Sequence, residues 1–167
     1  MATTETGSGP LRTRSAAVAL AGLAVAAGLT ATTAGAAQAS DSEEHCVLDV
    51  SSREYTCHGT PADARQRGQR IADTTGEVIG ATVFEDVDYG GSSLTITVPE
   101  PCPKNDNVDF WLDLDDHWQN RISSVQTWST CWVWLYPDSG DRAGPYKENH
   151  PDVGDHINDR TVTVGLS

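Results

Sequence analysis

The most regular feature of the sequence is a series of short runs after residue 79 in which every second position is hydrophobic. In the run SLTITV, Leu94, Ile96 and Val98 share one face, and Thr95 and Thr97 share the other. The runs ISSVQTW, WVWLY and TVTVGL continue the pattern, and no long helical period interrupts them. Short strands with turn residues between them predict an all-β sandwich or barrel.

A different pattern occupies residues 40–78. The run CVLDVSSREYTC predicts a hairpin, and the residues after it predict a short helix over 62–72. Thr60 can cap this helix and Gly76 can end it, although Gly68 weakens it. A segment of this size cannot form a hydrophobic core of its own, so we expect it to pack on the β-rich part.

The segment between residues 98 and 118 is rich in prolines and acidic residues. This composition predicts a long connection and not a tight turn. A long connection between strands is what a Greek key requires.

The first 39 residues have the order of a secretory signal peptide. Arg12 and Arg14 precede an apolar run over about residues 16–29, and small residues ending in AQA follow it. The run is too short and too rich in alanine for a membrane anchor. We therefore expect a secreted protein that is cleaved near Ala39 and has no membrane span.

The chain is strongly acidic. Its formal charge is −13, and it becomes −14 without the segment that carries Glu5, Arg12 and Arg14. Such a charge argues against nucleic acid and anionic membranes as partners and favours cations, although acidity also keeps secreted proteins soluble.

The four cysteines all follow residue 39. An even number in an oxidising compartment predicts disulfides, and three connectivities are open. Proximity favours Cys46 with Cys57 and Cys102 with Cys131. Zinc held by Cys46, Cys57 and the histidines beside them is the alternative, but the spacing is not that of a zinc finger.

The stretch VFEDVDYGGSS, residues 83–93, permits two interpretations. Asp86 and Asp88 could begin a calcium loop, but an EF-hand needs further acidic ligands and flanking helices, which this sequence lacks. Phe84 and Tyr89 instead predict two rings over a folded hairpin, whose tight turn needs Gly91.

The spacing of these residues resembles the Greek key signature of the βγ-crystallins. In that signature an aromatic residue is followed by six residues and a glycine, and a serine comes about thirty residues later. Phe84 and Gly91 match its first part, and Ser123 and Ser124 its last. A weaker second copy offers Tyr136 and Gly144, with one residue too many, and INDRTVTV lines up with QNRISSVQ. The resemblance implies a βγ-crystallin-like Greek key sandwich over residues 79–167, with motifs at about 79–128 and 132–167, preceded by the small hairpin and short helix.

Microbial members of this family bind calcium at a sequence Asn/Asp, Asn/Asp, any, any, Ser/Thr, Ser. The copies here are QNRISS, which begins with Gln119, and NDRTVT, which has Val162 in place of the hydroxyl ligand. Each site also takes a ligand from the loop after the first aromatic of the partner motif, here near Glu85 and Pro137. The resemblance therefore implies ligands at Asn120, Ser123, Asn158 and Asp159, and at Glu85 through its backbone oxygen.

Because each copy departs from the pattern at one position, we expect weak calcium binding, at one site rather than two. The alternative is that Asn120 and Asn158 only form turns and that no metal binds.

Two other functions remain open. Secreted crystallin-fold inhibitors of metalloproteinases share this sandwich, and the segment VPEPCPKNDN suits a rigid loop offered to a secreted protease. Five tryptophans are many for this length, and one or two exposed rings would suit an extracellular carbohydrate-binding module that binds cell-wall polysaccharide. No pair of acids, nucleophile with base or complete metal triad indicates an enzyme. A secreted, weak calcium-binding protein is the interpretation that we carry forward.

Overall fold

The structure is a computed structural model that describes residues 42–167. The predicted signal peptide, residues 1–39, lies outside the described residues. Within them, no helix is both long and apolar enough to cross a membrane. The elements are β1 (His45–Asp49), β2 (Tyr55–His58), α1 (Pro61–Thr75), β3 (Val78–Phe84), the short 3₁₀ helix η1 (Val87–Tyr89), β4 (Ser93–Val98), β5 (Phe110–Asp113), β6 (Ser124–Thr127), β7 (Val133–Pro137), β8 (Ala143–Tyr146) and β9 (Thr161–Leu166).

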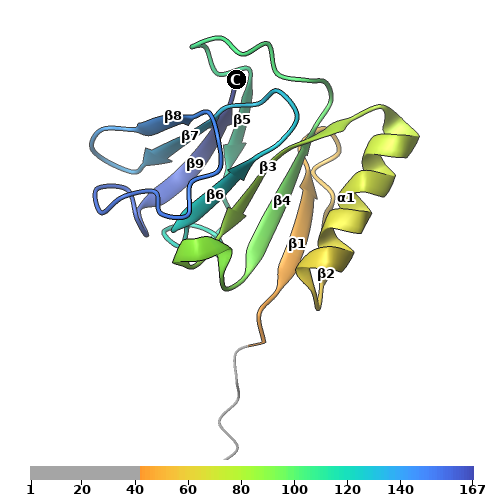
Figure 1. Ribbon diagram of the computed structural model, residues 1–167, viewed down its shortest axis with the longest axis horizontal. Helices are drawn as coiled ribbons and strands as arrows, with labels where there is room; N and C mark the ends of the chain where they lie inside the picture. The colour runs from red at the N-terminus through yellow and green to blue at the C-terminus, as the bar shows by residue number, and fades with distance from the viewer. Residues whose placement is uncertain (1–41) are drawn as a thin grey trace, which may run out of the picture. The chain divides into compact units, whose positions relative to one another are not determined.

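Two sheets face each other across the core (Figure 1). The first has five strands in the order β2-β1-β4-β3-β6, and the second has four in the order β5-β9-β7-β8. The hydrophobic face of SLTITV points between the sheets, where Leu94, Ile96 and Val98 are almost completely buried. The predicted sandwich is therefore confirmed.

The chain forms two Greek keys that exchange a strand. In the first motif, β3, β4 and β6 lie in one sheet, but the third strand, β5, crosses to the other sheet and pairs with β9. In the second motif, β7, β8 and β9 lie together, and the counterpart of β5 is reduced to a single bridge between His150 and Val125 of β6. This reduction accounts for the short interval in the second copy of the sequence pattern.

The N-terminal hairpin extends the first sheet. Strand β1 pairs with β4 in parallel and with β2 in antiparallel orientation. The Cys46–Cys57 disulfide joins the two strands of the hairpin, and the Cys102–Cys131 disulfide holds the long connection, so the pairing that proximity favours is the observed one.

The helix α1 covers the outer face of the first sheet (Figure 1). Its cap is the predicted one, since Thr60 Oγ1 accepts a hydrogen bond from the Asp63 amide at 3.1 Å. A side chain at Gly68 would reach within 3.3 Å of the Ile79 side chain, so the glycine that weakens the helix also lets it pack closely on the sheet. Thr95 and Thr97, on the polar face of SLTITV, are buried on this side of the sheet.

The stretch VFEDVDYGGSS forms a folded hairpin between β3 and β4. The Phe84 and Tyr89 rings meet edge to face, with centroids 5.6 Å apart. Ser124 Oγ, from β6, accepts a hydrogen bond from the Tyr89 amide at 3.1 Å and donates one to the Asp86 carbonyl at 2.6 Å. Gly91 has φ +67°, the left-handed conformation that its role in the turn requires.

The second copy departs from this arrangement. Tyr136 lies in β7 as expected, but Gly144 lies inside β8 rather than in the turn before it. A side chain at Gly144 would come within 2.6 Å of the Val133 carbonyl oxygen, so this glycine permits a close approach of two strands and does not form the turn of a folded hairpin.

Replacing Gly91 with alanine tests the folded hairpin. The new Cβ would face the Asp86 carboxylate at 2.9 Å from a backbone conformation that L-residues avoid, so Gly91→Ala should lower the free energy of unfolding by about 1–3 kcal/mol. Gly59→Ala is the control, because a Cβ there meets nothing within 4 Å. Urea denaturation compares the two, and equal losses would contradict this account of the hairpin.

Candidate metal centre

The two predicted calcium turns lie against each other, and each donates a backbone hydrogen bond to the other. The Asn120 amide donates to the Thr161 carbonyl at 2.8 Å, and the Asp159 amide donates to the Ile122 carbonyl at 3.2 Å. Asn120 and Asp159 both have positive φ, 60° and 55°, a conformation that Asn and Asp tolerate better than most residues. The two turns are thus equivalent, and each begins the last strand of its motif.

Side chains from both motifs meet between these turns. Ser123 Oγ donates a hydrogen bond to Asp159 Oδ1 at 3.3 Å. The Asn158 side-chain amide donates to Asp159 Oδ2 at 2.9 Å. The fold therefore brings together three of the predicted ligands, Ser123, Asn158 and Asp159, although Ser123 is 36 positions from Asp159 in the chain.

Two buried oxygen atoms at this place have no hydrogen-bond partner. They are Asn158 Oδ1 and Thr161 Oγ1; among residues 42–167 the only other such buried side-chain atom is His58 Nε2. A buried polar atom without a partner costs about 1–3 kcal/mol, and this turn holds two of them. Oxygen atoms from a carboxylate, an amide and hydroxyls suit a hard cation such as calcium.

Glu85 has a charged partner at the first turn. Its carboxylate forms an ion pair with Arg121, in which Nε donates to Oε1 at 3.0 Å and Nη2 donates to the same oxygen. Burial raises the pKa of Glu85, but hydrogen bonds from Arg121 and Ser92 and the charge of Arg121 outweigh it, so the pKa lies below its ordinary value. The guanidinium brings a positive charge to the first turn and is the ion-pair partner of the Glu85 carboxylate.

The final residues of the two copies also differ in what they do. Ser124 ties the folded hairpin through its hydroxyl, whereas Thr163 Oγ1 donates to Asp113 of β5 at 2.9 Å. Val162 has no hydroxyl to offer. Both copies of the sequence pattern thus lie in turns, but equivalent residues of the two copies have different partners.

Two residues of the centre were missed by sequence reasoning. Thr161 stands at a position where the motif accepts any residue, and only its burial without a partner draws attention to it. Arg121 also stands at such a position; its charge, opposite to that of Glu85, was the available signal, but their pairing across 36 positions follows from the fold.

Cys46 and Cys57, the two sulfur ligands of the zinc alternative, form a disulfide and are not thiolates. Glu44, Cys46 and Cys57 place potential ligand atoms within 4.8 Å of one another, but the two sulfurs are joined in a disulfide. A disulfide sulfur is not the thiolate that binds zinc.

The tryptophans divide between core and surface. Trp118 and Trp134 are buried, whereas Trp111 is 54% exposed and lies against Tyr136, with ring centroids 4.8 Å apart. Trp111 is thus the one exposed tryptophan in the described part of the chain that a carbohydrate-binding surface could use.

Comparison with known proteins gives a likeness of structure only. No family model matches the chain, and no curated protein matches it. Its structure is similar to a βγ-crystallin domain from Clostridium beijerinckii, with 22% identity over 52% of this chain and 95% of that chain, and a TM-score of 0.40. A βγ-crystallin from Ciona intestinalis gives 22% identity over 52% of this chain and 98% of that chain, with a TM-score of 0.37.

A double mutant of clostrillin, solved in complex with nickel, gives 21% identity over 52% of this chain and 95% of that chain, with a TM-score of 0.40. The fold is a Greek key sandwich. The exchanged strands and the folded hairpin tied by Ser124 place each part of the first sequence motif where a Greek key needs it.

The ion pair of Glu85 predicts a pH dependence of stability. Because folding lowers the pKa of Glu85, its contribution is present above the ordinary value of 4.5 and is lost as the pH falls below it. Since both side chains are partly exposed, Glu85→Gln should cost only about 0.5–1 kcal/mol at neutral pH, and the difference from the wild type should shrink below pH 4.5.

Urea denaturation at several pH values measures this difference. Glu148→Gln is the control, because that exposed carboxylate forms no ion pair among the described residues. A difference between wild type and Glu85→Gln that stays constant on acidification would show that the ion pair does not stabilise the fold.

Proposed function

We propose that this protein binds calcium weakly at one site, formed by Asp159, Asn158 and Ser123. The observation that supports this most is Asn158 Oδ1, a buried amide oxygen that lacks a partner beside the Asp159 carboxylate. Asp159 would supply charge, and Asn158 and Ser123 would supply neutral oxygen atoms. Thr161 Oγ1 is a further unpaired oxygen in the same turn.

The charges of the two turns favour one site over two. In the first turn, Arg121 places a guanidinium beside Glu85. A cation bound there would be repelled by this positive charge, and the Glu85 carboxylate would not be free to bind it. The turn at Asp159 has no such ion pair among the described residues, because Asp159 is hydrogen-bonded only to neutral groups. The net charge of −13 adds a general attraction for cations.

The number of ligands indicates a weak site. Calcium takes about 6–8 oxygen ligands, and the side chains named here supply fewer, so water would complete the shell. A dissociation constant on the order of 10⁻⁴–10⁻³ M, the range of extracellular calcium modules, is therefore expected. Such an affinity suits a secreted protein, because extracellular calcium is abundant.

Calcium titration of the decalcified mature protein tests this proposal. At a calcium concentration about ten times the dissociation constant, binding should add about 1.4 kcal/mol to the free energy of unfolding and raise Tm by about 5 °C. Asp159→Asn and Ser123→Ala should each weaken binding, the former by about tenfold or more because it removes the only charged ligand.

Asp155→Asn is the matched control. It removes one exposed carboxylate from the same loop, four residues before Asp159, and should leave the affinity almost unchanged. If Tm does not respond to calcium at millimolar concentration, or if both aspartate variants lose the response equally, the assignment to Asp159 is wrong.

A second candidate is proteinase inhibition by the connection between β4 and β5. Its residues from Pro99 to Pro103 are exposed except Cys102, whose disulfide to Cys131 anchors the segment. Thr130 Oγ1 adds a hydrogen bond to the Cys102 carbonyl at 2.6 Å. A segment held in this way loses little freedom when it binds a protease.

Inhibition assays with thermolysin-like and subtilisin-like enzymes test this second candidate. An inhibitor should act at micromolar concentration, and Glu100→Ala together with Lys104→Ala, both exposed, should weaken it while Tm stays constant. Normal protease activity at that concentration of wild-type protein would remove this candidate.

A further inference from the structure

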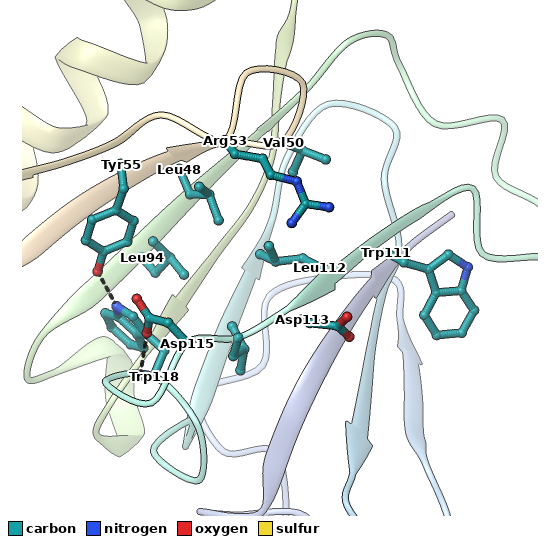
Figure 2. A pocket seen from close by; sticks show the side chains of 11 residues that line it. Leu48, Val50, Arg53, Tyr55, Leu94, Trp111, Leu112, Asp113, Asp115 and Trp118 are labelled. Carbon is teal, nitrogen blue, oxygen red and sulfur yellow. Dashed lines mark hydrogen bonds between the residues drawn. The ribbon is translucent and has the colours of Figure 1, made fainter.

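A cavity of about 280 Å³ opens where the N-terminal hairpin meets strand β5 (Figure 2). The first sheet continues past β4 to β1 and β2, whereas β5 is the edge strand of the second sheet. The inner face of β1 therefore has no strand of the second sheet opposite it, and the space is not filled. The apolar part of the cavity wall includes Leu48, Val50, Leu94, Leu112, Leu114 and Trp118.

One end of the cavity is held by a hydrogen bond between distant segments. Trp118 Nε1 donates to the Tyr55 hydroxyl at 2.7 Å (Figure 2). Trp118 is 2% exposed and Tyr55 is 37% exposed, so this pair joins the core to the surface of the hairpin. Because the hydroxyl accepts this bond, its own hydrogen is free to be donated to a ligand.

The cavity also has charged groups of both signs. Arg53, on the turn of the hairpin, directs its guanidinium toward Leu112 (Figure 2). This guanidinium forms no hydrogen bond or ion pair with any other residue in the range 42–167. On the other side, Asp113 and Asp115 each use Oδ1 for a hydrogen bond, the former from Thr163 and the latter from the amides of His117 and Trp118. The Oδ2 atoms have no such bond among the described residues.

We propose that this cavity binds a free apolar amino acid of the size of leucine or phenylalanine. Its side chain would lie on the apolar wall, its carboxylate on Arg53, and its ammonium group on Asp113 or Asp115. A zwitterion matches both signs of charge at the cavity. It is also neutral overall, so the net charge of −13 does not repel it as it would a simple carboxylate.

The size of the cavity supports a small ligand. Ligand cavities commonly have volumes of about 300–1,000 Å³, and this one, at about 280 Å³, is slightly smaller than that range. The site does not depend on calcium, because it shares no residue with the proposed calcium ligands Ser123, Asn158 and Asp159.

Isothermal titration calorimetry of the calcium-free mature protein with L-leucine and L-phenylalanine tests the proposal. Saturable binding of at least one of them is expected. For the amino acid that binds, the amide, which lacks the carboxylate, and the deaminated acid, which lacks the ammonium group, should each bind about tenfold more weakly. A deaminated acid or an amide that binds as tightly as the amino acid would overturn the zwitterion assignment.

Variants locate the site. Arg53→Gln should weaken binding of the amino acid about tenfold. It should leave binding of the amide unchanged, because the amide has no carboxylate that Arg53 could bind. Arg70→Gln, an exposed arginine on α1, is the matched control and should have no effect. Val50 is half-buried and lines the cavity, so Val50→Trp should fill part of the cavity and abolish binding, while the calcium response of Tm persists.

The persisting calcium response, or an unchanged near-ultraviolet circular dichroism spectrum, shows that Val50→Trp is folded. No heat of binding with either amino acid at millimolar concentration, or binding that survives both Arg53→Gln and Val50→Trp, would overturn the proposal.

Discussion

The pairing of β5 with β9 is the interaction on which the rest of the structure depends. Because β5 belongs to the first motif but lies in the second sheet, neither motif can complete its sheets without the other. The exchange places the starts of β6 and β9 side by side, and there the two turns that carry the candidate ligands bond to each other through Asn120 and Asp159. A pair of turns that faces each other across two motifs is thus a consequence of backbone pairing, before any ligand side chain is considered.

The same topology explains why the two copies of the motif have different roles. The first copy keeps the folded hairpin, with Ser124 as its tie and Gly91 as its turn residue. The second copy is shortened to a bridge at His150 and uses its last threonine to bond β5. A charge pair occupies the first turn, and unpaired oxygen atoms are left in the second. The two copies of the motif therefore differ in the contacts of their turns.

The N-terminal hairpin adds a feature that two Greek keys alone would lack. By pairing in parallel with β4, it makes the first sheet wider than the second, and the excess width produces the apolar cavity beside β5. The helix α1 covers the opposite face, so that the added strand is buried on one side and lined by a cavity on the other. An extension that makes one sheet wider than the other can in this way leave a cavity at its edge.

The sequence by itself determined what depends on neighbouring residues. The alternation in SLTITV predicts a strand with one core face, Thr60 and Gly76 mark the ends of α1, and Phe84, Tyr89 and Gly91 predict the folded hairpin, because each signal acts within a few positions of the chain.

The tertiary structure alone decided which distant groups meet. It pairs Glu85 with Arg121 and Ser123 with Asp159, each 36 positions apart, buries Thr95 and Thr97 on the helix side of the sheet, and leaves Asn158 and Thr161 with unpaired oxygen atoms. A local pattern specifies the conformation of a segment, but the partner of a side chain depends on which strands lie next to each other. In this protein that was set by the exchange of β5 and by the parallel pairing of β1 with β4.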